Sequence, residues 1–301
     1  MITSRPQMEE KTVSTEGEGP PVRRRHLMLK MRKLRQAADL SQEDAAKAMG
    51  WNRSKIHRIE YGRNQKIRAA DIIALCRLYK VADAETDALA ELARQSGKRG
   101  WWHRYSDILP GPYIEFEAEA TVIRDFEITL IPGLLQTPEY MRAILDRAAG
   151  ATDEEIQRRI DARIARQKIL TRKQSPPRLW AIIDEGAIRR QVGSPEVMRG
   201  QLQHLIEMSC RPNIDIQILR FEEGAHAGVA GQFLILDFSG LDQVVYIEAE
   251  QDGFYLESSD QTSRYTLIFD KVQAAAGSTE RSVAFLQALA SGTEPPHLSG
   301  D

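Results

Sequence analysis

The feature that most constrains this chain is a pair of short helices predicted near the N-terminus and joined by a three-residue turn. Ser41, followed three residues later by an acid, is typical of a capping box that starts a helix over Gln42–Met49. Gly50 readily adopts the left-handed conformation that ends a helix, and Asn52 is a good N-cap for a second helix over Arg53–Tyr61. Two helices joined by a short turn with glycine form the helix-turn-helix arrangement.

The second of these helices is predicted to have an apolar face and a polar, basic face. In a helix-turn-helix, the N-terminal end of this helix enters the major groove of DNA. There an arginine binds guanine through two hydrogen bonds, and we predict this role for Arg53 and Arg58. Gln42 is predicted to hold a phosphate, and Lys66 is a further candidate for a backbone contact. The predicted DNA-binding residues are Gln42, Asn52, Arg53, Ser54, Lys55, His57, Arg58, Arg63 and Asn64.

Charge is divided unevenly along the chain. Residues 23–100 carry 19 Lys and Arg against 9 Asp and Glu, whereas residues 101–301 have a net charge of −10. A basic block joined to an acidic one indicates nucleic acid as the partner of the first block and a different partner for the second. Three arginines, Arg23–Arg25, open the basic block. They are either a minor-groove arm or, as composition favours, an ordinary solvated helix start.

The helix-turn-helix segment resembles the phage-repressor-like (XRE) family of transcription regulators. The residues that carry the resemblance are Leu40-Ser41-Gln42-Glu43, Ala46, Met49-Gly50, Ile56, Ile59-Glu60 and Gly62. The chain departs from the family at Trp51, where a small aliphatic residue is usual, and at Ala45, where leucine is usual. We expect Trp51 to fill the space that Ala45 leaves. The resemblance implies a buried ion pair between Arg35 and Glu60, although by charge alone both could be ordinary surface residues.

Composition divides the chain into two domains with flanking segments. Residues 1–22 are polar and rich in glycine and proline, so we expect a disordered tail. A helical domain over residues 23–97 follows, with later helices at about 69–80 and 84–96. Residues 98–112 are a linker whose aromatic side chains are expected to pack locally. A second domain over residues 113–291 precedes a short tail over residues 292–301.

The second domain is predicted to be α+β (α/β), with a small sheet of about four to five strands. The predicted strands are rich in Ile, Val, Phe and Tyr and are separated by turn residues: Leu179–Ile183, Ile214–Leu219, Phe233–Phe238, Val244–Glu248 and Phe254–Leu256. The predicted helices are Tyr113–Glu127, Pro138–Arg147, Asp153–Arg172, Pro195–Cys210, 259–274 and 279–290.

This second domain resembles the effector half of a large group of actinobacterial regulators, of the type found with the sporulation regulator WhiJ. The resemblance covers about residues 24–290 and is carried by Ile123–Tyr140, Arg163–Leu170, Asp184–Arg190, Gln201–Leu205 and Val245–Glu248. It implies an XRE domain followed by a domain of poorly understood role. Members of the group are commonly encoded beside a small partner protein and are described as antitoxin-like.

We expect no enzymatic activity, metal or cofactor, because the sequence has none of the common nucleophile, zinc or phosphate-binding motifs. The carboxylate clusters Asp184-Glu185 and Glu248-Glu250 could in principle do acid–base work, but solvated or salt-bridged surface acids are favoured, because no nucleophile or metal cluster accompanies them. His226 lies in a glycine-rich loop and could line a pocket, but a structural or exposed histidine is favoured.

Cys76 and Cys210 are far apart, which suits a reducing cytoplasm. No apolar stretch approaches the roughly 20 residues of a membrane span.

Two functions remain open from the sequence. The first is a sequence-specific transcription regulator whose acidic C-terminal domain senses a small protein partner or a ligand. The second is an antitoxin-like protein that neutralises a small partner and uses DNA binding for autoregulation. In both, double-stranded operator DNA is the partner of the basic domain, a homodimer is expected because two half-sites raise affinity, and the protein acts in the cytoplasm on the nucleoid.

Overall fold

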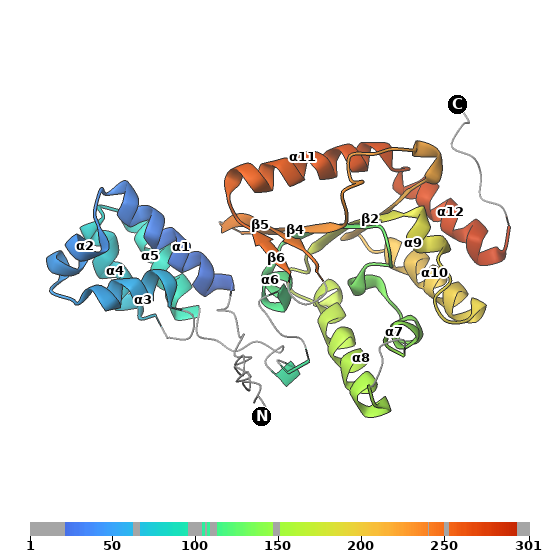
Figure 1. Ribbon diagram of the computed structural model, residues 1–301, viewed down its shortest axis with the longest axis horizontal. Helices are drawn as coiled ribbons and strands as arrows, with labels where there is room; N and C mark the ends of the chain where they lie inside the picture. The colour runs from blue at the N-terminus through green and yellow to red at the C-terminus, as the bar shows by residue number, and fades with distance from the viewer. Residues whose placement is uncertain are drawn as a thin grey trace, which may run out of the picture.

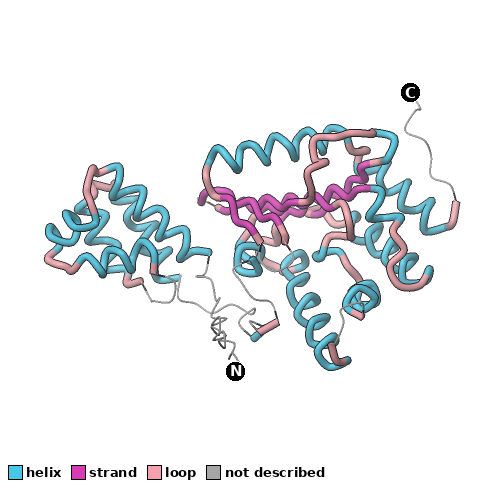
Figure 2. The backbone as a smooth tube through the Cα atoms, viewed as in Figure 1, coloured by secondary structure: helices cyan, strands magenta, loops and turns pink. Residues whose placement is uncertain are grey.

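The computed structural model describes residues 22–62, 67–95, 104–105, 107–108, 113–146, 151–239, 241–249 and 253–293. It contains a helical bundle and a larger domain built on one sheet (Figures 1 and 2). The predicted tails and the predicted linker lie almost wholly outside the described residues. Helix α1 begins at Val22, so this residue belongs to the bundle and not to the predicted tail.

The bundle consists of five helices within the part of the chain that the structure describes. They are α1 (Val22–Ala37), α2 (Gln42–Met49), α3 (Arg53–Tyr61), α4 (Ala69–Leu78) and α5 (Asp83–Gln95). Their core buries Leu27 and Met31 of α1, Ile56 of α3 and Leu75 of α4. Trp51 is half-buried against the same core, which includes the fully buried Ala45.

The turn between α2 and α3 forms through local capping. The Ser41 hydroxyl accepts a hydrogen bond from the Asp44 backbone N–H, and the Asp44 carboxylate accepts one from the Ser41 N–H, which completes a capping box. Gly50 has φ 65°, in the left-handed region. The Asn52 side chain accepts a hydrogen bond from the Lys55 N–H, 2.9 Å away, and so caps α3. The predicted helix bounds and caps are confirmed in this segment.

The second domain is built on a sheet of six strands in the order β3-β2-β1-β4-β5-β6. The strands are β1 (Val122–Glu127), β2 (Arg178–Asp184), β3 (Ile214–Leu219), β4 (Phe233–Phe238), β5 (Leu241–Ile247) and β6 (Phe254–Leu256). Strand β1 pairs parallel with β2, and β2 pairs parallel with β3. The remaining neighbours are antiparallel. The predicted α+β class is confirmed, and five of the six strands were predicted.

Helices cover both faces of the sheet (Figure 1). Helix α11 (Ser259–Ala275) covers one face, where Phe126 and Ile235 pack against Phe269. The opposite face packs against several helices, as shown by Ile123 and Ile216 in one cluster with Leu205. The remaining helices are α6 (Tyr113–Glu119), α7 (Pro138–Leu145), α8 (Asp153–Gln167), α9 (Glu185–Arg189), α10 (Pro195–Ser209) and α12 (Thr279–Ser291), with short 3-10 helices at Gly133–Leu135, Lys168–Thr171 and Phe221–Glu223.

The prediction of one helix over Tyr113–Glu127 is wrong for the second half of this range. Helix α6 ends at Glu119, and the following residues form β1, which lies between β2 and β4. The acids and alanines of this stretch favour a helix by intrinsic propensity. Pairing on both sides with β2 and β4 overrides that preference, because an interior strand satisfies its backbone hydrogen bonds through both neighbours. The other bounds differ by a few residues at element ends.

Strand β1 carries a buried carboxylate. Asp125 is 3% exposed, and its Oδ1 atom has no hydrogen-bond partner among the described residues. Glu117 of α6, also buried, is bound by Arg166 of α8 and by the Tyr113 hydroxyl. Burial raises the pKa of Asp125 to about 7, and the negative charges of Glu117 and Glu248 add to the rise.

This burial predicts a pH dependence of stability. The folded protein holds a proton on Asp125 that the unfolded chain releases, so stability falls as pH rises from the ordinary carboxyl pKa of 3.8 toward about 7. We expect Asp125→Asn to raise the thermal midpoint at about pH 8 and to flatten the pH dependence of stability between about pH 4 and 7. Thermal unfolding of both proteins measures this. Asp161→Asn, at an exposed position on α8, is the control; equal pH profiles for Asp125→Asn and wild type would contradict the prediction.

Candidate nucleic-acid interface

Helix α3 turns one face to the core and the other to solvent. Ile56, Ile59 and Glu60 are buried. Four predicted DNA-binding side chains on the same helix are exposed: Arg53, Ser54, His57 and Arg58. Two cations and two hydrogen-bonding side chains are therefore presented together on one short helix, the arrangement that reads base edges in the major groove.

The exposed face of α3 continues onto α1. The His57 and Tyr61 rings lie 4.9 Å apart between centroids, and Tyr61 is 40% exposed. The Arg32 guanidinium of α1 lies 5.1 Å from the centroid of the Tyr61 ring, a cation–π contact. Sequence reasoning missed Arg32, because only the packing of α1 beside α3 shows that it borders this face.

Two other predicted residues have roles within the bundle. The Lys55 ammonium pairs with Asp71 at 2.8 Å and lies 3.4 Å from the centroid of the Trp51 ring. Asn52 is exposed and caps α3. Their contact with DNA stays a prediction. Arg63, Asn64 and Lys66 lie outside the described residues, so the structure does not place them.

A buried ion pair fixes α3 against α1. Arg35 donates from Nε to one oxygen of the Glu60 carboxylate at 2.7 Å and from a terminal nitrogen to the other at 3.0 Å. Arg35 also donates to the Leu40 carbonyl, and Gln42 donates from Nε2 to Glu60 at 2.9 Å. Gln42 therefore joins the buried pair and is half-buried at the start of α2. Its predicted phosphate contact would have to use its remaining amide hydrogen or the helix N-terminus.

The Arg35–Glu60 pair is enclosed by the bundle. Arg35 is 8% exposed and Glu60 is 4% exposed. The hydrogen bond to Glu60 raises the pKa of Arg35, and burial next to Glu60 raises the pKa of Tyr79. Arg24 of α1 donates to the Gly62 carbonyl at the end of α3, 2.8 Å away. Arg24 is 7% exposed and bound to its own bundle, so at this residue the segment is neither a free minor-groove arm nor the solvated helix start that composition favours.

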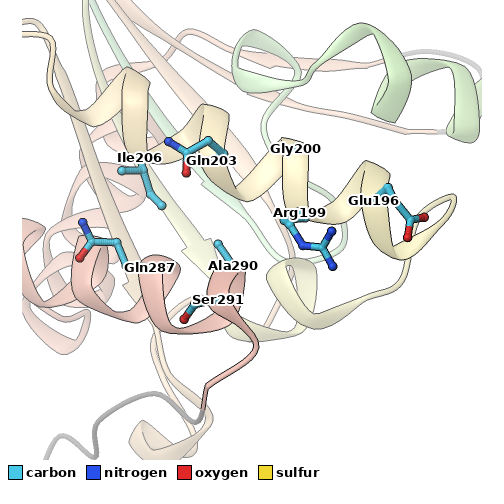
Figure 3. A pocket seen from close by; sticks show the side chains of 8 residues that line it. All are labelled: Glu196, Arg199, Gly200, Gln203, Ile206, Gln287, Ala290 and Ser291. Atoms are coloured by element: carbon cyan, nitrogen blue, oxygen red, sulfur yellow. The ribbon is translucent and has the colours of Figure 1, made fainter.

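Shallow hollows in the described part of the C-terminal domain include the following two. One of about 470 Å³ lies between α10 and α12 and is shown in Figure 3; it is lined by Glu196, Arg199, Gly200, Gln203, Ile206, Gln287, Ala290 and Ser291. The other, of about 360 Å³, lies between residues 227–233 and α11. His226 precedes this loop, accepts a hydrogen bond from the Gly228 N–H, and packs edge-on against Phe126. It has a structural role beside the second hollow.

No cluster of three or more His, Cys, Asp or Glu side chains in the described part of the chain is placed to hold a metal ion. Both cysteines are free thiols, Cys76 buried and Cys210 exposed. Of the helices described, none has the length and apolar character needed to cross a membrane.

Comparison with known families defines the class of protein. Residues 27–89 match the family described as helix-turn-helix domain, so the N-terminal domain is that of a DNA-binding regulator. Residues 111–288 match the family described as domain of unknown function (DUF5753), and this match spans more than half of the chain. The chain belongs to the DUF5753 family. No curated protein and no solved structure matches it significantly.

The buried pair predicts a large effect on stability. Glu60→Gln leaves the Arg35 guanidinium buried without its counter-charge, and breaking such a pair costs about 3–5 kcal/mol. We expect the variant to unfold at a clearly lower denaturant concentration. Glu43→Gln, at an exposed position on α2, is the control. Equal midpoints for Glu60→Gln and the control would mean that the pair is not needed to hold α3.

The exposed face of α3 predicts base recognition. Arg53→Ala and Arg58→Ala are each expected to cost about 1–3 kcal/mol on a specific duplex and to relax specificity at one position. Arg94→Ala, which removes an exposed arginine of α5, is the matched control. Gel-shift titrations on a specific and a random duplex measure the effect. An equal loss of affinity for both duplexes would mean that the two arginines contact phosphates and not bases.

Proposed function

We propose that this protein is a sequence-specific transcription regulator that binds a double-stranded operator through α3. The observation that carries the proposal is the exposed set Arg53, Ser54, His57 and Arg58, held outward by the buried Arg35–Glu60 pair. The net charge of residues 23–100, +10, supports it, because a basic domain attracts the phosphate backbone. Its site of action would be the nucleoid in the cytoplasm, and its nearest functional class the XRE regulators.

The C-terminal domain is proposed to sense rather than to catalyse. Residues 101–301 have a net charge of −10, which disfavours DNA as their own partner. A small protein partner is the first candidate, because an acidic surface attracts a basic protein. A ligand in the hollow beside His226 is the second candidate, since its volume of about 360 Å³ is within the range of small-molecule sites. If the protein partner were toxic alone, the regulator would be antitoxin-like, as in the WhiJ-type actinobacterial group.

A homodimer is the proposed DNA-binding form. One helix-turn-helix reads only a few base pairs, whereas a two-fold dimer reads two half-sites about 34 Å apart or a multiple of this distance. The larger acidic domain is the proposed site of dimerisation, because the bundle uses much of its surface for DNA.

One experiment tests the regulator proposal and the dimer together. Selection of bound duplexes from a random pool should enrich an inverted repeat, and light scattering of the full chain should give twice the mass of 34.0 kDa. An enriched single half-site with a monomeric mass would contradict the dimer. Failure to enrich any sequence, under salt conditions where the protein binds DNA, would contradict sequence-specific regulation.

A further inference from the structure

Helix α1 has a face that contacts the C-terminal domain. Arg25 of α1 pairs with Glu257, which precedes α11, at 2.5 Å. The Arg25 guanidinium also lies over two aromatic rings, 5.8 Å from the centroid of Phe116 on α6 and 5.5 Å from that of Tyr255 on β6. The two side chains of the ion pair are 32% and 18% exposed, so the contact is partly shielded from solvent.

A second contact lies at the edge of the sheet. The Asp242 backbone N–H, in β5, donates to Nε2 of His26 at 2.8 Å, and the Asp242 carboxylate pairs with Lys33 at 2.7 Å. Within the residues described, β6 pairs with β5 only from Val245 to Ile247. His26 therefore binds an edge N–H that β6 leaves open. Burial lowers the pKa of His26, and the negative charge of Asp242 opposes this shift. The bond uses an unprotonated ring nitrogen as acceptor, which only the neutral imidazole has.

These contacts, which we call the α1 dock, comprise Arg25, His26 and Lys33 of α1 with Glu257 and Asp242. Figure 1 shows α1 as the helix of the bundle beside the sheet. The same helix carries the residues that hold α3. Arg24, adjacent to Arg25 in the sequence, donates to the Gly62 carbonyl at the end of α3, and Arg35 pairs with Glu60. One rigid helix thus contacts both the recognition helix and the acidic domain.

We propose that the α1 dock is an autoinhibitory contact. It holds the acidic C-terminal domain against the bundle and so lowers the affinity of the bundle for DNA. The proposal rests on the proposed function of α3 in binding DNA. Whatever partner the C-terminal domain binds would act by opening or closing this dock.

Electrostatics gives the direction of the effect. In the docked form Arg25 and Lys33 are paired with carboxylates, so two cations of the bundle are neutralised by the other domain. Asp242 and Glu257 lie at ion-pair distance from the bundle, well within the Debye length of about 8 Å, so salt screens their negative charges only in part. Undocking frees the two cations and lets the acidic domain move away from the phosphates, so it should increase DNA affinity.

The test neutralises the acidic side of the dock and leaves the bundle unchanged. The variant is Asp242→Asn with Glu257→Gln in the full chain. Its matched control is Glu196→Gln with Glu207→Gln, which removes the same charge from exposed positions on α10. The probes are the duplex enriched by selection and a random duplex, and small-angle scattering without DNA reports on domain separation.

We expect the dock variant to bind the selected duplex about tenfold more tightly than the control, a typical size for coupling between sites, and to have a larger radius of gyration. An affinity equal to that of the control, or tighter binding without expansion, would overturn the proposal. Failure of the proposed function would be visible separately, because selection with the wild type would then enrich no duplex over the random pool.

A charge-reversal pair tests whether the Arg25–Glu257 contact itself holds the domains together, separately from any general effect of substitution on the fold. Glu257→Arg alone should expand the protein, and adding Arg25→Glu should restore the compact form and the wild-type affinity by recreating the pair in reverse. If the double reversal stays expanded, or if the single reversal stays compact, the pair does not hold the domains together.

Discussion

The buried ion pair between Arg35 and Glu60 is the interaction on which the rest of the N-terminal domain depends. A fully enclosed carboxylate is tolerated only when its charge and lone pairs are satisfied, and Glu60 obtains this from Arg35 and Gln42. The three groups come from α3, α1 and α2. The pair therefore fixes how the three helices meet, and with that the direction in which the exposed residues of α3 point.

Helix α1 extends this constraint to the second domain. Its buried residues, such as Leu27 and Met31, belong to the bundle core, while Arg25 and Lys33 reach the acidic domain. Movement of the C-terminal domain relative to the bundle must break or reform contacts on α1. Exposed pairs such as Lys33–Asp242 contribute little individually, so the dock is suited to opening at a small cost in free energy.

The sequence predicted the helix-turn-helix at the level of single residues because its signals are local. Each of these signals depends on residues within one helical turn: the capping box at Ser41, the left-handed Gly50 and the N-cap at Asn52. Strand β1 was not predicted, since its place in the sheet depends on β2 and β4, which lie far along the chain. The sheet order and the burial of Asp125 could not be predicted for the same reason.

The same distinction holds for the candidate site. The exposed residues of α3 follow from helical periodicity, and the Arg35–Glu60 pair was expected only through the family resemblance. The ion pair of Lys55 with Asp71 joins α3 to α4 across the bundle, and the contact of Arg25 with Glu257 joins segments more than two hundred residues apart. Local patterns carry no information about such contacts.

DNA binding and docking of α1 oppose each other in the proposed mechanism, and thermodynamic linkage requires the effect to be reciprocal. If undocking favours DNA, saturating DNA must favour undocking. The reporter is the backbone N–H of Asp242, which donates to His26 across the dock. Hydrogen exchange of this amide, measured by NMR with and without the selected duplex, should become faster when DNA is bound. Unchanged or slower exchange on the DNA complex would contradict the account.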